Sequence, residues 1–72
     1  MSDMEIILNE LSAEVENVRR LSHDLAKVLE NPLCDRNQLE FIDKMREDSV
    51  KHINKLTEML VDVFYEAEER KE

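Results

Sequence analysis

The sequence of 72 residues contains no glycine, no tryptophan, one proline and one cysteine. Tight turns and phosphate-binding loops rely on glycine and proline, so a turn-rich sheet, a glycine-rich phosphate loop and a disordered linker are all disfavoured. A lone cysteine cannot form a disulfide within the chain, which is typical of proteins of the reducing cytosol. We therefore expect an all-α protein of long helices, located in the cytoplasm.

Long hydrophobic runs are missing as well. The longest unbroken apolar run is Ile6 to Leu8, far short of the ~20 residues that span a bilayer. No basic and then apolar segment typical of a signal peptide occurs at the start. The length leaves room for one small domain over residues 1–72, and so small a core closes an active-site pocket with difficulty. We therefore expect no membrane contact, no enzymatic activity and no cofactor.

Acidic residues outnumber basic ones by 18 to 10, which gives a net charge of −8. Residues 1–16 and 56–72 together carry 11 acidic and 2 basic residues, a net charge of −9, whereas residues 17–55 carry a net charge of +1. Acidity keeps small helical proteins in solution, and it also repels nucleic acid and favours basic partners. The charge distribution predicts that a protein partner with a basic surface binds at the acidic end.

A first helix is predicted over residues 3–30 by apolar residues at alternating spacings of four and three. Ser2 or Asp3 is placed to cap its start. Asn31-Pro32 ends it, with Asn31 expected in the left-handed conformation. The expected seam comprises Met4, Leu8, Leu11, Val15, Val18, Ser22, Leu25 and Leu29.

A second helix is predicted over residues 37–69, after a connection at residues 31–36. Residues 37–40 read as a capping box, and residues 35–38 offer an equally good frame. Its expected seam comprises Leu39, Ile42, Arg46, Ser49, Ile53, Leu56, Leu60, Val63 and Ala67. Arg46 is expected to extend to the rim of this seam and pair with Asp43 or Asp24.

So short a connection makes the helices antiparallel neighbours, with residues whose numbers sum to about 67 at one level. One side of the expected seam is mostly apolar, and we expect a second hairpin to cover it, giving a homodimeric four-helix bundle. The predicted dimer interface comprises Ile7, Glu14, Leu21, Val28, Met45, His52 and Met59. Glu14 and His52 are expected to hydrogen bond there.

Exposed apolar residues beside the acidic end suggest where a partner binds. Aromatic side chains with apolar neighbours supply much of the energy of protein interfaces, and surrounding charge steers association. The predicted partner-binding residues are Ile6, Val61, Phe64, Tyr65, Glu66 and Glu69. We therefore expect a small cytosolic protein-binding module, acting as an adaptor or inhibitor through an acidic helical surface.

Two other functions are considered. The segment Leu21-Ser22-His23-Asp24-Leu25 resembles the phosphoacceptor box of sensor histidine kinases, whose dimerisation domain is also a hairpin that forms a four-helix bundle. The resemblance implies phosphotransfer at His23, although Ala26 and Val28 differ from the family's pattern. RNA binding is the other alternative, through basic residues at outer helix positions: Arg20, Lys27, Lys44 and Lys51.

A metal site is not expected. His52 follows Asp48 by four residues and lies level with Glu14. Helical bundles that bind metals through carboxylates and histidines use a Glu-x-x-His spacing. Neither His23, preceded by Arg20 at that spacing, nor His52, preceded by Ser49, has it.

Overall fold

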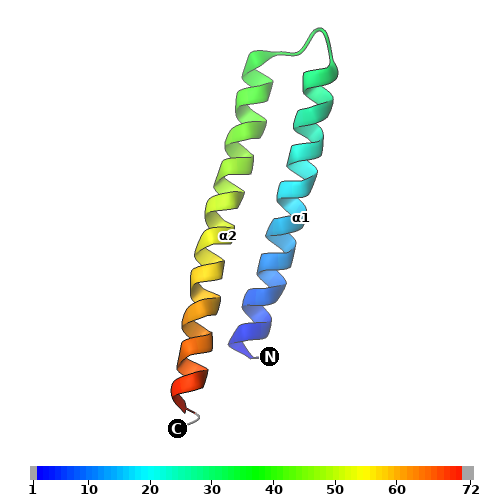
Figure 1. Cartoon of the computed structure of the whole chain (residues 1–72). Helices are drawn as coiled ribbons and strands as arrows, with labels where there is room; N and C mark the ends of the chain where they lie inside the picture. The colour runs from blue at the N-terminus through cyan, green and yellow to red at the C-terminus, as the bar shows by residue number, and fades with distance from the viewer. Residues whose placement is uncertain (1, 71–72) are drawn as a thin grey trace.

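The computed structural model describes residues 2–70, which form a hairpin of two antiparallel helices (Figure 1). Helix α1 covers Asp3–Glu30 and helix α2 covers Arg36–Arg70. The two helices pack against each other along their length, and the ends of the described chain lie together at the end opposite the connection. The result is a rod with extents of 61 × 16 × 14 Å. In the described part of the chain, neither helix is long and apolar enough to cross a membrane.

Helix α1 is bounded by the residues that the sequence indicates. The Ser2 hydroxyl caps its start and accepts a hydrogen bond of 3.2 Å from the Glu5 amide. At the other end Asn31 is extended, with φ −79° and ψ 120°, so the left-handed conformation expected there is wrong. The reason is Pro32, whose ring disfavours helical backbone in the preceding residue and favours an extended one.

Helix α2 begins at Arg36, in the earlier of the two capping frames that the sequence leaves open. The Asp35 carboxylate accepts a hydrogen bond of 2.9 Å from the Asn37 amide. The Asp35 backbone carbonyl accepts a hydrogen bond from the Leu39 amide, which closes the first turn of the helix. A carboxylate at this position also interacts favourably with the positive end of the helix dipole.

The predicted seam of α2 is confirmed except at its last residue. Ser49 and Leu56 are buried, and Leu56 is the most enclosed of the described side chains at 2% exposure. Ala67 is exposed. The remaining seam residues are half-buried: Leu39, Ile42, Arg46, Ile53, Leu60 and Val63.

The predicted seam of α1 is wrong in part, because the helix is rotated. Ile7 and Leu21 are buried, at 6% and 5% exposure. The predicted seam residues Leu8, Val15 and Leu29 are exposed instead. Residues spaced by seven along a helix form a line on its surface, and three neighbouring lines of α1, starting at Met4, Ile7 and Leu8, are largely apolar. A single neighbouring helix, α2, covers only two of these lines. The line of Leu8, Val15 and Leu29 is left outside the hairpin.

We predict that Leu56→Ala lowers the free energy of unfolding by about 2–5 kcal/mol, since it removes a fully buried side chain and leaves a cavity. Its neighbour Lys55 is exposed, and Lys55→Ala is expected to change stability by less than about 0.5 kcal/mol. Urea denaturation followed by circular dichroism measures both. Equal effects would show that the seam of α2 is misplaced.

Candidate protein-binding surfaces

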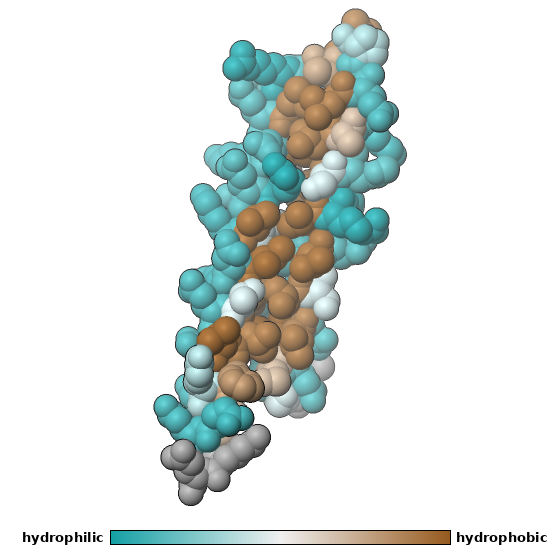
Figure 2. All heavy atoms as spheres, viewed as in Figure 1, coloured by the Kyte–Doolittle hydropathy of each residue, from teal (hydrophilic) through white to brown (hydrophobic). Residues whose placement is uncertain are grey.

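An apolar face extends along one side of the hairpin. On α1 it contains Leu8, Val15 and Leu29, spaced by multiples of seven residues, and on α2 it contains Val50 and Phe64. These five residues, which we call the apolar face, are all exposed. Figure 2 shows apolar side chains on this side following the junction of the two helices for most of the length of the rod. So long an apolar surface is unusual for an isolated small domain.

The apolar face deepens into a cleft near the chain termini. This terminal cleft has a volume of about 480 Å³ and is lined by Met4, Leu8, Leu60, Val61, Phe64 and Tyr65. The rings of Phe64 and Tyr65 meet edge to face, with 5.9 Å between their centroids. The predicted partner-binding residues Val61, Phe64 and Tyr65 therefore lie together.

A second cleft at the same end of the rod has a different lining. It has a volume of about 340 Å³ and is lined by Asp3, Ile6, Ile7, Met59, Asp62 and Val63. We call it the acidic cleft. Ile6 lines this cleft and Val61 lines the terminal cleft, so the two residues belong to different clefts at the same end of the rod. The two residues share a level along the rod, but the rotation of the helices places them on different sides.

Glu66 and Glu69, the other predicted partner-binding residues, extend the rim of the acidic cleft. They follow Asp62 by four and seven residues on α2, so the three carboxylates lie along one side of the helix. On α1, Glu10 follows Asp3 by seven residues. All of these side chains are exposed. The cleft therefore combines an apolar floor with acidic edges from both helices.

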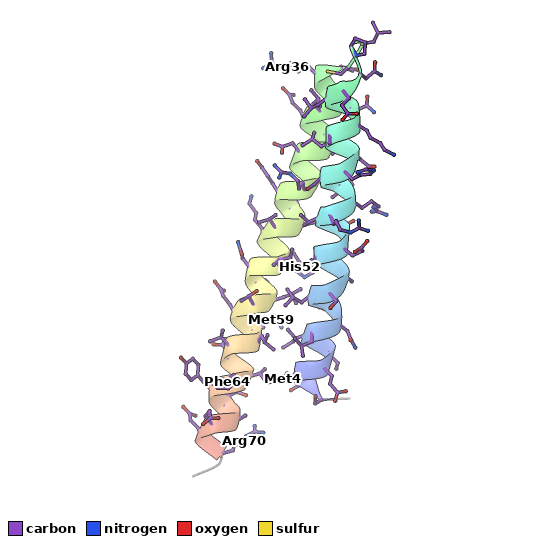
Figure 3. All side chains as sticks on the ribbon, turned by 45° about the vertical axis from the view of Figure 1, so that its right-hand side comes forward. Met4, Arg36, His52, Met59, Phe64 and Arg70 are labelled. Carbon is purple, nitrogen blue, oxygen red and sulfur yellow. The ribbon has the colours of Figure 1, made fainter. Side chains whose placement is uncertain are left out.

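Polar pairs cross the middle of the seam. The Asn17 side-chain amide donates a hydrogen bond of 2.8 Å to the Ser49 hydroxyl. His52, labelled in Figure 3, has its Nδ1 3.1 Å from a carboxylate oxygen of Glu14, so these two side chains lie side by side within one hairpin. Asn17, which directly precedes the expected seam residue Val18 in the sequence, was not predicted to take part. The level rule could have found it, because it places Asn17 opposite Ser49.

Arg46 behaves as predicted. Its Nη2 donates a hydrogen bond of 2.8 Å to the Asp43 carboxylate at the rim of the seam, while its Nε stays buried without a hydrogen-bond partner among the described residues. The same neutralisation occurs on the outer surface of α1, where Arg19 pairs with Glu16. Hydrogen bonding to Arg19 lowers the pKa of Glu16 and raises that of Arg19. The Arg46 pair leaves the middle of the apolar face without net charge.

The residues of the predicted dimer interface differ in how far they are buried within one hairpin. Ile7 and Leu21 are already buried inside a single hairpin, which leaves little of either side chain for a second copy to cover. Val28 is half-buried. Met45 and Met59 are exposed, and Met59 lines the acidic cleft rather than the terminal cleft. Exposed apolar residues therefore lie on both sides of the seam, Met45 and Met59 on one side and the apolar face on the other.

The remaining candidate residues are dispersed. His23 is exposed on α1. The four basic residues considered for RNA binding are also exposed, two on α1 and two on α2. Arg20 among them donates a hydrogen bond of 2.7 Å to the side-chain oxygen Oδ1 of Asn17. Cys34 is exposed in the connection. Within residues 2–70, no three histidine, cysteine, aspartate or glutamate residues are grouped as a metal site requires.

Comparison of the chain with known protein families, curated proteins and solved structures found no match. Evidence for function therefore comes from the shape, apolar surface and charge of the hairpin. Of these features, the apolar face and the acidic end are the most extensive.

Proposed function

We propose that this chain is a small protein-binding module, an adaptor or inhibitor, that acts as a homodimer. Two hairpins pack apolar face against apolar face in a four-helix bundle, and the acidic ends of the bundle bind a basic surface of another protein. The observation that carries this proposal is the apolar face, which is exposed along a hairpin with a very small core of its own.

The core of one hairpin is too small to stabilise it well. Among residues 2–70, the apolar side chains that are buried are Ile7, Leu21 and Leu56. Domains of this size need disulfides, metals, oligomerisation or exceptionally regular packing to be stable. Stable folds bury each apolar surface against another layer. A second copy provides that layer, because it offers the same apolar surface at the same concentration.

The size of the surface suits a dimer. A side of the rod measuring 61 × 16 Å offers roughly 1,000 Å² per copy, against about 800 Å² per partner in a standard stable interface. The polar Ser22 and Thr57 occupy the same helix lines as the apolar residues, and the line of α2 also carries two charged residues, Asp43 and, at its start, Arg36. Arg36 is paired with Glu40. Asp43 is paired with Arg46, so packing a second copy against this surface would not bury Asp43 as an unpaired charge.

Charge favours an antiparallel pair of hairpins. In a parallel pair, two ends with a net charge of −9 each would lie side by side. In an antiparallel pair, each acidic end lies beside the nearly neutral half of its partner, which reduces the repulsion. The acidic ends then lie at opposite ends of the bundle, where both are accessible to other proteins.

We predict that Val50→Lys converts the dimer to a monomer, raising the dissociation constant on the order of a hundredfold, since it places an unpaired charge in the interface. Met45→Lys is the matched control, because Met45 and Val50 belong to the same helix and are 40% and 41% exposed. We expect Met45→Lys to remain dimeric. Analytical ultracentrifugation distinguishes the two, and the opposite outcome would move the interface to the side of Met45.

We further predict that Val50→Cys, made together with Cys34→Ser, forms an intermolecular disulfide readily on mild oxidation. In an antiparallel dimer with full overlap of the apolar faces, the two-fold axis passes near Val50. Fourteen residues separate Val50 from Arg36, so the two connections lie roughly 40 Å apart at 1.5 Å per residue. Wild-type Cys34 should not cross-link within the dimer. Efficient Cys34 cross-linking in dilute protein would indicate parallel hairpins.

Binding at the acidic end is tested with a synthetic 18-residue helical peptide of lysine, leucine and alanine. We predict that Glu66→Lys with Glu69→Lys slows its association at least about tenfold at low salt and flattens the salt dependence, because steering depends on charge near the site. Asp24→Lys with Glu30→Lys changes the net charge equally in the other half, and we expect an effect below about threefold. Equal effects in stopped-flow measurements would contradict the proposal.

A further inference from the structure

We infer that the acidic cleft is the part of the acidic end that receives the partner, and that its ligand is a basic amphipathic helix carrying lysine or arginine. This inference rests on the proposed function and specifies the site and the partner chemistry. The cleft lies between the two helices near the termini, where Asp3 of α1 and Asp62 of α2 both line it.

The lining of the cleft matches the structure of a long basic side chain. The buried Ile7 and the half-buried Val63 form the floor, whereas Met59 is exposed at the surface. A lysine or arginine has an apolar stem and a charged tip, so its stem can lie on this floor while its tip reaches a carboxylate. The flexible thioether of Met59 adapts its shape to such a stem.

The acidic rim matches the spacing of a helix. Asp62, Glu66 and Glu69 succeed one another at intervals of four and three residues, and basic residues at the same intervals on a partner helix form a complementary line. Lys55 lies seven residues before Asp62 on the same line of α2, so this line is basic there and acidic only toward the termini. The favourable surface is therefore confined to the terminal part of the rod.

The acidic cleft remains accessible in the proposed dimer. Met4, Leu8 and Phe64 line the terminal cleft, on the side that a second copy would cover, whereas Met59 lines the acidic cleft (Figure 3). The two surfaces can therefore be occupied at the same time. In an antiparallel dimer the two acidic clefts would lie roughly 30 Å apart at 1.5 Å per residue, so one dimer would hold two basic segments.

The test compares two double variants of the dimeric protein with equal net charge. Asp3→Asn with Asp62→Asn removes the carboxylates that line the cleft, whereas Glu5→Gln with Glu58→Gln removes two exposed carboxylates near the same end. Calorimetry with the 18-residue peptide is expected to show about tenfold weaker binding for the first variant and less than threefold weaker binding for the second.

The methyl groups of Met59 and Met4 provide an independent readout, since they mark the acidic cleft and the terminal cleft respectively. In nuclear magnetic resonance spectra of the wild-type dimer, the peptide should shift the Met59 methyl signal and leave that of Met4 unchanged. Equal losses of affinity in the two variants would overturn the cleft but leave binding at the acidic end in place. A shift of Met4 with dissociation of the dimer would also overturn it. If the peptide does not bind the wild-type protein, both proposals for the acidic end fail.

Discussion

The packing of α1 against α2 buries one strip of each helix, and the choice of strip on α1 determines every other surface of the molecule. Neighbouring lines of residues on a heptad-repeating helix are about 50° apart. Burial of the line of Ile7 and Leu21 therefore leaves the line of Leu8, Val15 and Leu29 exposed beside α2. The same rotation brings Glu14 to His52 and Asn17 to Ser49. The polar contacts and the exposed apolar surface have one cause.

Much of the fold was predictable because its signals are local. Ser2, Asp35 and Pro32 mark helix ends through hydrogen bonds or backbone restrictions that involve neighbouring residues only. The seam of α2 was predictable because a single pair of lines on that helix is suited to burial. The connection is too short to allow any arrangement but an antiparallel one.

The candidate surfaces were harder to predict because they depend on the rotation of α1. That helix has three apolar lines, of which α2 can cover two, and the sequence pattern does not determine which two lines are covered. An error of one line placed Leu8 in the seam, whereas the structure leaves this residue exposed. Ile6 and Val61 share a level, which is set by residue number, but they line different clefts because side is set by rotation. This error does not affect the position of the acidic residues along the rod, because that position depends on residue number and not on the rotation of α1.

Because the core of one hairpin is small, pairing of two hairpins would make the amount of folded protein depend on how much chain is synthesised. When folding and pairing stabilise each other, the folded fraction depends on the total concentration of chain. The abundance of the paired form then rises more steeply than in proportion to synthesis at low levels. Chains made in small numbers remain largely unpaired and open to proteolysis. If the chain pairs as proposed, a hairpin with three buried apolar side chains among its described residues would combine its binding surface with a threshold on the level of gene expression.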